Sequence, residues 1–183
     1  VKSKKVFRAY YKNPEATQES FRDGWYCTGD VGFLNERGHL KITDRKKDII
    51  VTASGKNIAP QNIENLIKTV PIISQIMIYG DRKKYLAALV TLNPDEIRKY
   101  AQGQKIPFHN YKELIKNPKI YSYVKKAIEE KNRTLASYET VKRFTILDSD
   151  FTQETGELTP TLKVKRKFVS QKYKEILEQM YQE

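Results

Sequence analysis

Residues 25–57 read WYCTGDVGFLNERGHLKITDRKKDIIVTASGKN, and this stretch decides how the rest of the chain is interpreted. It contains a TGD tripeptide, then a hairpin pattern, then the charged run DRKKD ahead of a short apolar segment. In the hairpin, Leu40 and Ile42 alternate with polar side chains, which is typical of a strand. The stretch therefore predicts a two-stranded hairpin that ends in an exposed charged segment at residues 44–48. This segment is the one candidate domain boundary.

The bulk composition is that of a soluble globular protein. The chain has 183 residues, of which 39% are hydrophobic and 31% charged, enough for one domain with an extension. It lacks an apolar run long enough to cross a bilayer, and its basic N-terminus lacks a signal-peptide segment. The single Cys27 excludes an internal disulfide or a cysteine metal cluster, so we expect a reducing, cytoplasmic location. A start without Met indicates a piece of a longer protein.

The net charge of +12 raises the question of a polyanionic partner. Lysines are spread along the whole chain and interleaved with Glu and Asp, and no zinc-finger spacing or RNA-binding signature accompanies them. We therefore expect no nucleic-acid partner. His39 and His109 have no Cys, Ser or carboxylate at nucleophile or metal spacing, so no metal site is expected in this chain.

Helices and strands alternate along the chain without a long regular βαβ series, which favours the α+β class. Val169, Tyr173, Ile176 and Met180 form one apolar stripe of the last helix. The expected helices begin near residues 14, 60 and 94, cover 110–135 with a fresh start at 117–118, and end with 165–180. The expected strands are 31–35, 39–43, 49–51, 72–79, 85–92 and 141–147.

The order of these motifs resembles the C-terminal region of AMP-forming acyl-CoA synthetases of the long-chain fatty acid type, members of the adenylate-forming superfamily. The similarity runs from YYKNPEAT at residues 10–17 to the last helix. It includes the TGD tripeptide, the charged run, and LTPTLKVKR at residues 158–166. The motif set is specific because several independent motifs occur in the right order.

The resemblance implies a division of the chain into three parts. Residues 1–43 correspond to the trailing end of a large N-terminal adenylation domain, residues 44–47 to a hinge, and residues 48–183 to a small, mobile C-terminal domain. That domain is expected to have a β-hairpin and a small mixed sheet flanked by helices. Asp44 and Lys47 match the hinge, although a solvated charged loop explains them equally well without the resemblance.

Two residues match nucleotide-binding positions of the family. Each carboxylate oxygen of Asp30 can accept a hydrogen bond from a ribose hydroxyl, and Gly29 would let the backbone approach the sugar closely. Arg45 offers guanidinium donors to the ribose or phosphates of ATP or AMP. Taken alone, the tripeptide is a turn signal. Trp25 lies where the family has an aromatic near the adenine and acyl pocket, and a purely structural aromatic is an equal alternative.

Ser54, Gly55 and Lys56 form a second loop of interest. The loop is not a phosphate-binding P-loop, because the glycine five residues earlier and the hydroxyl residue after the lysine are missing. In the family the matching loop lines the route of coenzyme A. Gly55 is also well explained as a turn glycine.

Lys163 matches the catalytic lysine of the family. A lysine on a short loop is a mobile cation that can bridge an acyl carboxylate and an α-phosphate, and that would stabilise charge as pyrophosphate leaves. The family usually has glycine before this lysine, and here Leu162 takes that place, as in long-chain members. The family motif can therefore be aligned on this sequence in two ways: Lys163 is the preferred match for the catalytic lysine, and Lys165 is the second choice.

The resemblance implies an ATP-dependent long-chain fatty acid–CoA ligase that forms an acyl-adenylate and then the acyl-CoA, with release of pyrophosphate and AMP. Its partners would be ATP, CoA, a fatty acid and the N-terminal adenylation domain. Mg²⁺ is expected for the full enzyme but not bound by this chain. Peripheral membrane contact of the full-length protein is compatible with the resemblance. The alternative is a non-catalytic nucleotide-binding or interaction module of the same fold.

Overall fold

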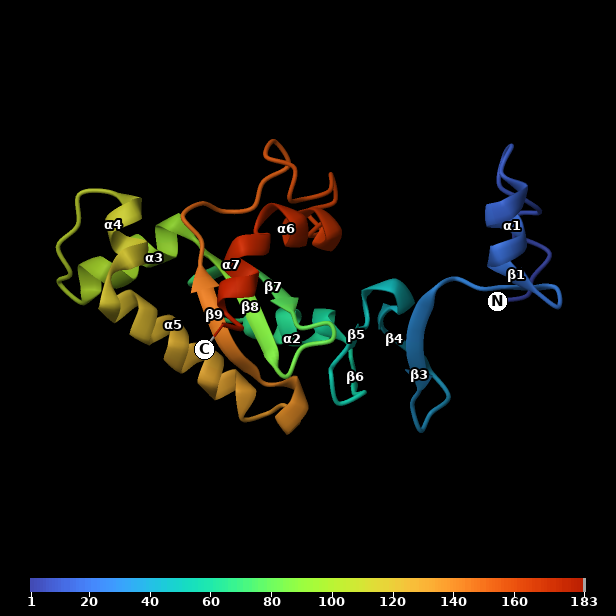
Figure 1. Cartoon of the computed structure of the whole chain (residues 1–183), viewed down its shortest axis with the longest axis horizontal. Helices are drawn as coiled ribbons and strands as arrows, with labels where there is room; N and C mark the ends of the chain where they lie inside the picture. The colour runs from blue at the N-terminus through green and yellow to red at the C-terminus, as the bar shows by residue number, and fades with distance from the viewer. Residues whose placement is uncertain (183) are drawn as a thin grey trace. The chain divides into compact units, whose positions relative to one another are not determined.

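The computed structural model describes residues 1–182, which divide into two compact units (Figure 1). The first unit contains residues 1–47 and the second begins at Asp48. The two units are described separately below. Among the described residues, no helix combines the length and the apolar character that a membrane crossing requires.

The first unit begins with a short helix, α1 (Pro14–Ser20), as the sequence predicts. Asn13 caps it by accepting a hydrogen bond from the Ala16 backbone N–H at 3.0 Å. Two short antiparallel strands follow, β1 (Phe21–Arg22) and β2 (Trp25–Tyr26). The rings of Phe7, Phe21 and Tyr26 pack against one another.

The predicted hairpin is present as the antiparallel strands β3 (Asp30–Leu34) and β4 (Leu40–Arg45). Its register places Asp30 opposite Arg45 and Leu34 opposite Leu40. The pairing is irregular next to Gly32, where a Cβ atom would lie 2.5 Å from the Lys41 carbonyl oxygen. Only glycine fits at this point of the hairpin.

The charged segment differs from the prediction in one respect. Strand β4 continues through Arg45, and a 3₁₀ turn, η1 (Lys46–Asp48), follows. The prediction that all its charges are exposed is wrong for Asp44, whose residue surface is only 2% exposed. Side chains alternate between the two faces of a strand. Because Arg45 points toward Asp30 and solvent, Asp44 points to the opposite side of the strand.

The second unit contains a small sheet with the strand order β7-β8-β9. Strand β7 (Ile73–Tyr79) is antiparallel to β8 (Leu86–Leu92), which is parallel to β9 (Val141–Ile146). Every residue of β8 is buried, as expected for a central strand. A separate pair, β5 (Ile50–Val51) and β6 (Asn57–Ile58), precedes the sheet. The mixed sheet confirms the predicted α+β class.

Helices cover both faces of this sheet (Figure 1). Ile76 and Ile78 pack into a core with the helices that precede and follow the β7–β8 hairpin, whereas Met77 between them packs with the C-terminal helices. This alternation is the two-residue period of a strand. The helices of the first layer are α2 (Pro60–Ile67), α3 (Pro94–Gly103), α4 (Tyr111–Lys116) and α5 (Pro118–Asn132). The second layer contains α6 (Arg166–Lys172) and α7 (Lys174–Gln179).

Two predicted helices are divided in the structure. The helix over 110–135 is interrupted at Asn117, where the sequence indicated a fresh start, and the short 3₁₀ turn η2 (Ser137–Glu139) follows. The prediction of one continuous helix over 165–180 is wrong, because the backbone departs from helical geometry at Tyr173 (φ −107°, ψ 25°). The Tyr173 hydroxyl contacts a buried carboxylate, a tertiary interaction that helical periodicity does not record.

Candidate functional site

Asp30 and Arg45, the two predicted nucleotide-binding residues, lie side by side at the open end of the β3–β4 hairpin. Arg45 Nε lies 2.8 Å from Asp30 Oδ1, and Arg45 Nη1 donates to the Thr28 carbonyl oxygen at 3.3 Å. The side chains are 25% exposed for Asp30 and 53% for Arg45. Both groups therefore keep donor and acceptor atoms open to solvent, so this end of the hairpin can contact a polar ligand.

The turn before the hairpin exposes its backbone. Gly29 has a φ of +74°, a conformation that favours glycine, and no atom lies within 4 Å of the position that a Cβ would take. Its carbonyl oxygen accepts from the Lys46 N–H at 2.7 Å, and Thr28 Oγ1 accepts from the Asp30 N–H at 3.2 Å. The turn is thus fixed while its surface stays open. Nearby Trp25 is 53% exposed, which is compatible with both alternatives given for it.

The predicted hinge residues lie at the division between the two units. Asp44 Oδ1 accepts from the Arg45 N–H at 2.7 Å within β4, and Lys47 is exposed in η1. The division itself falls between Lys47 and Asp48.

The loop that contains Ser54, Gly55 and Lys56 is a tight turn built on Thr52. Thr52 is buried, and its hydroxyl oxygen accepts from the Lys56 N–H at 3.1 Å. Gly55 has a φ of +76°, which supports its role as a turn glycine. The Lys56 ammonium lies 5.7 Å from the ring centroid of Tyr138. The turn presents Ser54 and Lys56 to solvent.

Lys163 lies in a narrow exposed loop between β9 and α6. Residues 158 and 164 form an antiparallel bridge, and inside it the Thr159 N–H donates to the Lys163 carbonyl oxygen at 2.8 Å. The Lys163 N–H donates to Thr159 Oγ1 at 3.1 Å. Within residues 1–182 the Lys163 ammonium makes no ion pair. The loop therefore holds the Lys163 backbone while its cation remains available.

Leu162, which takes the place of the glycine expected from the resemblance, has a strained backbone. Its φ is +58°, in the left-handed region that L-residues other than glycine rarely adopt. The Leu162 N–H donates to the Thr159 carbonyl oxygen at 2.8 Å, which closes the turn. The alternative lysine, Lys165, lies at the start of α6, outside the turn.

A buried ion pair at the start of α6 escaped the sequence analysis. Arg166 pairs with Glu64 of α2, and the two side chains are only 17% and 10% exposed. Glu64 also accepts from the Ile78 N–H at 2.7 Å, and Arg166 donates to the Ile78 carbonyl oxygen at 3.2 Å. The pair therefore joins α2, β7 and α6. The available signal was a charged residue directly beside Ile63 on the apolar face of α2.

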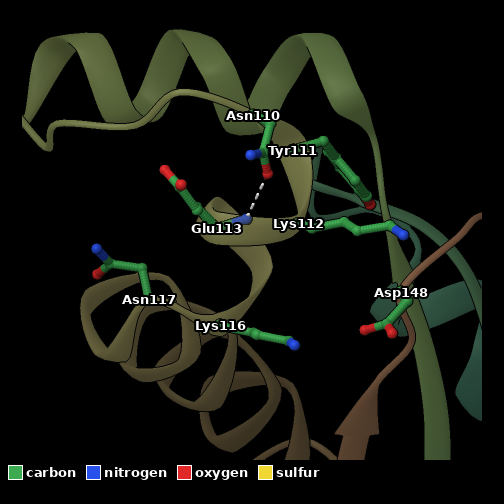
Figure 2. A pocket seen from close by; sticks show the side chains of 7 residues that line it. All are labelled: Asn110, Tyr111, Lys112, Glu113, Lys116, Asn117 and Asp148. Carbon is green, nitrogen blue, oxygen red and sulfur yellow. Dashed lines mark hydrogen bonds between the residues drawn. The ribbon is translucent and has the colours of Figure 1, made fainter.

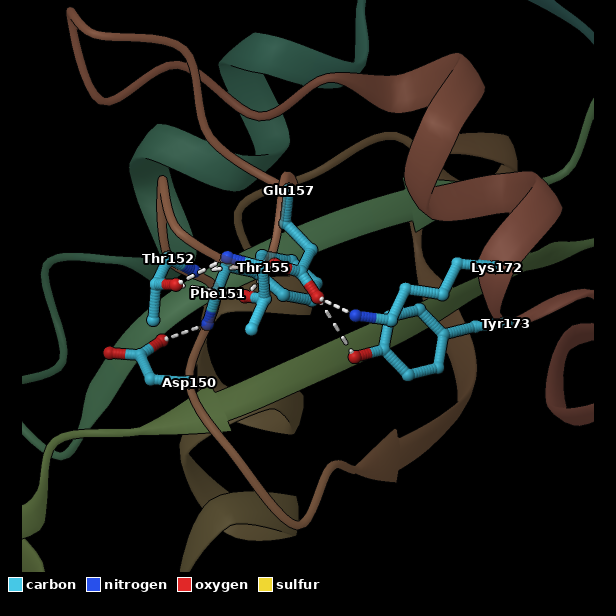
Figure 3. Close-up of polar contacts among 7 residues, drawn as sticks. All are labelled: Asp150, Phe151, Thr152, Thr155, Glu157, Lys172 and Tyr173. Carbon is cyan, nitrogen blue, oxygen red and sulfur yellow. Dashed lines mark hydrogen bonds and ion pairs between the residues drawn. The ribbon is translucent and has the colours of Figure 1, made fainter.

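A second buried glutamate, Glu157, directly precedes the loop that contains Lys163 (Figure 3). It accepts hydrogen bonds from the Thr155 hydroxyl, from Lys172 Nζ at 2.5 Å and from the Tyr173 hydroxyl at 3.3 Å. Burial alone would raise the pKa of Glu157, but the bonds from Lys172 and Thr155 outweigh it and lower the pKa to about 2. Glu157 is therefore ionised at neutral pH.

A hollow of the second unit lies beside α4 and has a volume of about 660 Å³ (Figure 2). Its polar atoms serve the helix ends: Asn110 and Asn117 cap α4 and α5, and Glu113 accepts from the His109 N–H at 2.8 Å. None of the predicted site residues lines it. The lining residues are Asn110, Tyr111, Lys112, Glu113, Lys116, Asn117 and Asp148. In the described part of the chain, no group of three or more His, Cys, Asp or Glu side chains could hold a metal ion.

Comparison with known proteins gives one consistent family. The sequence profile described as the AMP-binding enzyme C-terminal domain matches residues 47–183. The long-chain-fatty-acid–CoA ligase FadD15 of Mycobacterium tuberculosis is 42% identical over 177 residues, which are 96% of this chain and 30% of that protein. The peroxisomal long chain acyl-CoA synthetase 6 of Arabidopsis thaliana is 37% identical, over 97% of this chain and 26% of its own length. The chain thus spans less than a third of these relatives.

A solved structure supports the same assignment. The A domain of the carboxylic acid reductase from Segniliparus rugosus, in complex with AMP and a co-purified carboxylic acid, matches with a TM-score of 0.81 and 30% identity. The match covers 98% of this chain and 27% of that chain. The likeness therefore includes both units.

Proposed function

The chain belongs to the family of AMP-binding enzyme C-terminal domains, and from this premise we propose that it is the C-terminal part of an ATP-dependent long-chain fatty acid–CoA ligase. The observation that carries the proposal is the exposed loop that fixes the Lys163 backbone and leaves its ammonium without an ion pair among the described residues. A cation held in this way suits a reaction in which two anions must approach each other.

In the proposed first step, a fatty acid carboxylate oxygen attacks the α-phosphorus of ATP. The new O–P bond forms as the bond to the pyrophosphate oxygen breaks, which gives an acyl-adenylate and pyrophosphate. Lys163 would contact both the carboxylate and the α-phosphate, and reduce their repulsion. Lys165 remains the second choice for this role.

Asp30 and Arg45 would bind the nucleotide. The carboxylate of Asp30 would accept hydrogen bonds from the ribose hydroxyls, and the Arg45 guanidinium, held 2.8 Å away, would keep that carboxylate oriented and donate to the nucleotide. The open backbone at Gly29 would allow the sugar to approach closely.

In the proposed second step, residues 44–47 act as a hinge between the trailing end of the adenylation domain, residues 1–43, and the mobile domain. The thiol of CoA attacks the acyl carbonyl, the C–S bond forms, AMP leaves and the thiol proton is lost. Ser54, Gly55 and Lys56 would line the route of CoA. Because Asp44 is buried, we place the larger backbone rotation at Lys47, which is exposed.

The proposed reaction also needs parts that this chain does not supply. A fatty acid pocket, a phosphate-binding loop and Mg²⁺ ligands would come from the N-terminal adenylation domain of the same polypeptide. We therefore expect this chain alone to show no pyrophosphate exchange with palmitate and ATP. The cytoplasmic location and any peripheral membrane contact of the full protein remain predictions.

The deciding experiment uses the full-length protein, with Lys163→Ala and Lys165→Ala compared in parallel. We expect Lys163→Ala to lower acid-dependent ATP–pyrophosphate exchange by about 10²–10³-fold, the loss typical of a removed charge-stabilising group. ATP binding should be largely retained. Normal exchange in Lys163→Ala together with loss in Lys165→Ala would transfer the role to Lys165. Normal exchange in both variants would show that neither lysine acts in adenylation, and would favour the alternative that this chain is a non-catalytic nucleotide-binding or interaction module.

A further inference from the structure

The loop that contains Lys163 is held by a short ladder of hydrogen bonds. Its base is the bond from the Lys165 N–H to the Glu157 carbonyl oxygen at 2.7 Å. The bridge between residues 158 and 164 comes next, and the Thr159–Lys163 pair forms the last rung. The position of the Lys163 backbone is thus determined through two rungs by the position of residue 157.

Glu157 is fixed more firmly than any other residue of this ladder. Its side chain is 2% exposed, and it accepts from Lys172 at 2.5 Å and from the Thr155 hydroxyl. Weaker contacts come from the Tyr173 hydroxyl at 3.3 Å and from the Thr152 N–H at 3.5 Å. Figure 3 shows these donors converging on one carboxylate from α6 and from the preceding turn.

A buried charge is a costly way to hold a loop. Removing an ion pair from water costs several kcal/mol per ion, and well-packed apolar side chains often stabilise a fold at least as well. What the carboxylate adds is direction, because hydrogen bonds constrain angle and distance whereas apolar contacts allow sliding. Direction matters where a cation must meet its reactants, since a displacement of about 1 Å can lower a rate about 10²-fold.

We propose that Glu157 is a positioning residue for Lys163: its buried carboxylate, held by Lys172 and Thr155, sets the base of the loop and thereby the place of the Lys163 ammonium during adenylation. This inference rests on the proposed function, because it assigns a role toward a lysine that acts in the first step. Glu157 itself does not contact substrate.

The test measures the two half-reactions of the full-length protein separately. One assay follows acid-dependent ATP–pyrophosphate exchange, and the other follows thioester formation from supplied acyl-adenylate and CoA. We expect Glu157→Gln to lower the kcat of exchange by about 10–10²-fold with the KM for ATP within about twofold. Thioester formation should stay within about twofold of the unaltered protein, because Lys163 is proposed to act only in the first step.

Two further variants keep the test informative if Glu157→Gln folds poorly. Thr155→Val removes one donor and preserves the shape of the side chain, so we expect a smaller loss of exchange in the same direction. Glu96→Gln is the matched control, because Glu96 also pairs with a lysine, Lys99 at 2.7 Å, but lies on the exposed surface of α3. It should leave both half-reactions unchanged.

A double variant separates positioning from general stability. If Glu157 acts through Lys163, Glu157→Gln should cause no further loss of exchange in a Lys163→Ala background. A proportional loss of both half-reactions, or an additive loss in the double variant, would overturn the positioning role. Normal exchange in Glu157→Gln together with lost exchange in Lys163→Ala would overturn the positioning role of Glu157 and leave the proposed role of Lys163 intact. Normal exchange in Lys163→Ala would overturn the proposed role of Lys163, and this inference with it.

Discussion

Replacing Arg166 by methionine tests whether the buried pair with Glu64 joins the layers of the second unit. The change removes the guanidinium that pairs with the Glu64 carboxylate, which is 10% exposed. Breaking a buried pair from one side costs about 3–5 kcal/mol. The lost bond to the Ile78 carbonyl oxygen adds about 1 kcal/mol. Glu64 keeps the bond from the Ile78 N–H at 2.7 Å, so we expect a total near the lower bound of this sum, about 4 kcal/mol.

Urea unfolding followed by far-UV circular dichroism measures this loss, because most of the helices belong to the second unit. The fluorescence of Trp25 reports the first unit in the same samples and should not change its midpoint. Arg98→Met is the matched control: Arg98 pairs with Asp95 at 3.5 Å on the exposed face of α3, and its loss should cost less than about 0.5 kcal/mol. A loss for Arg166→Met that equals this control, or stays below about 1 kcal/mol, would refute the reasoning.

Three further predictions concern Glu157, Leu162 and Leu89. The folded pKa of Glu157, about 2, lies below the ordinary 4.5, so its stabilisation is complete above pH 4.5 and is lost as the pH falls toward 2. This difference between the two pKa values corresponds to a stabilisation of the fold by at most ~3 kcal/mol. We expect about 1–2 kcal/mol, because water screens the pair at Lys172, which is 38% exposed. The difference in free energy of unfolding between the unaltered chain and Glu157→Gln, measured by urea titration, should therefore become smaller from about pH 5 to about pH 3. A difference that stays constant over this range would contradict the prediction. Leu162 has a φ of +58°, where any side chain with a Cβ costs about 1–2 kcal/mol relative to glycine. Leu162→Gly should therefore not destabilise the chain in the same assay, whereas Leu162→Val should destabilise it because a β-branched side chain fits this region worst; equal effects would contradict this. Leu89→Ala empties a fully buried position in β8 and should cost about 2–5 kcal/mol, and a loss under about 1 kcal/mol would show that the sheet is not the core.

Local patterns were sufficient to predict much of the open end of the hairpin, where Asp30 and Arg45 meet. The two-residue alternation at Leu40 and Ile42 indicated a strand, and the turn residues between the two strands indicated a hairpin. Hairpin pairing then brings Asp30 and Arg45 together although fifteen positions separate them. The same alternation would place Asp44 on the face of Leu40 and Ile42, but these two side chains are 65% and 53% exposed, so alternation does not account for the burial of Asp44.

The two buried glutamates, Glu64 and Glu157, could not be predicted in this way. Glu64 and Arg166 are 102 positions apart in the sequence, and Glu157 is 15 positions from Lys172. Glutamate is usually exposed, so a buried glutamate can be recognised only when its partner is known to be near. The partner is brought near by the packing of α6 on the sheet, which no local pattern specifies. The break at Tyr173 escaped prediction for the same reason.

The parallel pairing of β8 with β9 has a consequence for how the protein is made. Leu86 pairs with Val141, so the ribosome must synthesise more than fifty further residues before the central strand gains its second neighbour. The other face of that strand, including Leu89, waits longer still, for Val169 and Leu177. Contacts this distant in sequence form slowly. During synthesis one edge and one face of this apolar strand therefore stay uncovered, and exposed strand edges and apolar surface favour aggregation of a nascent chain.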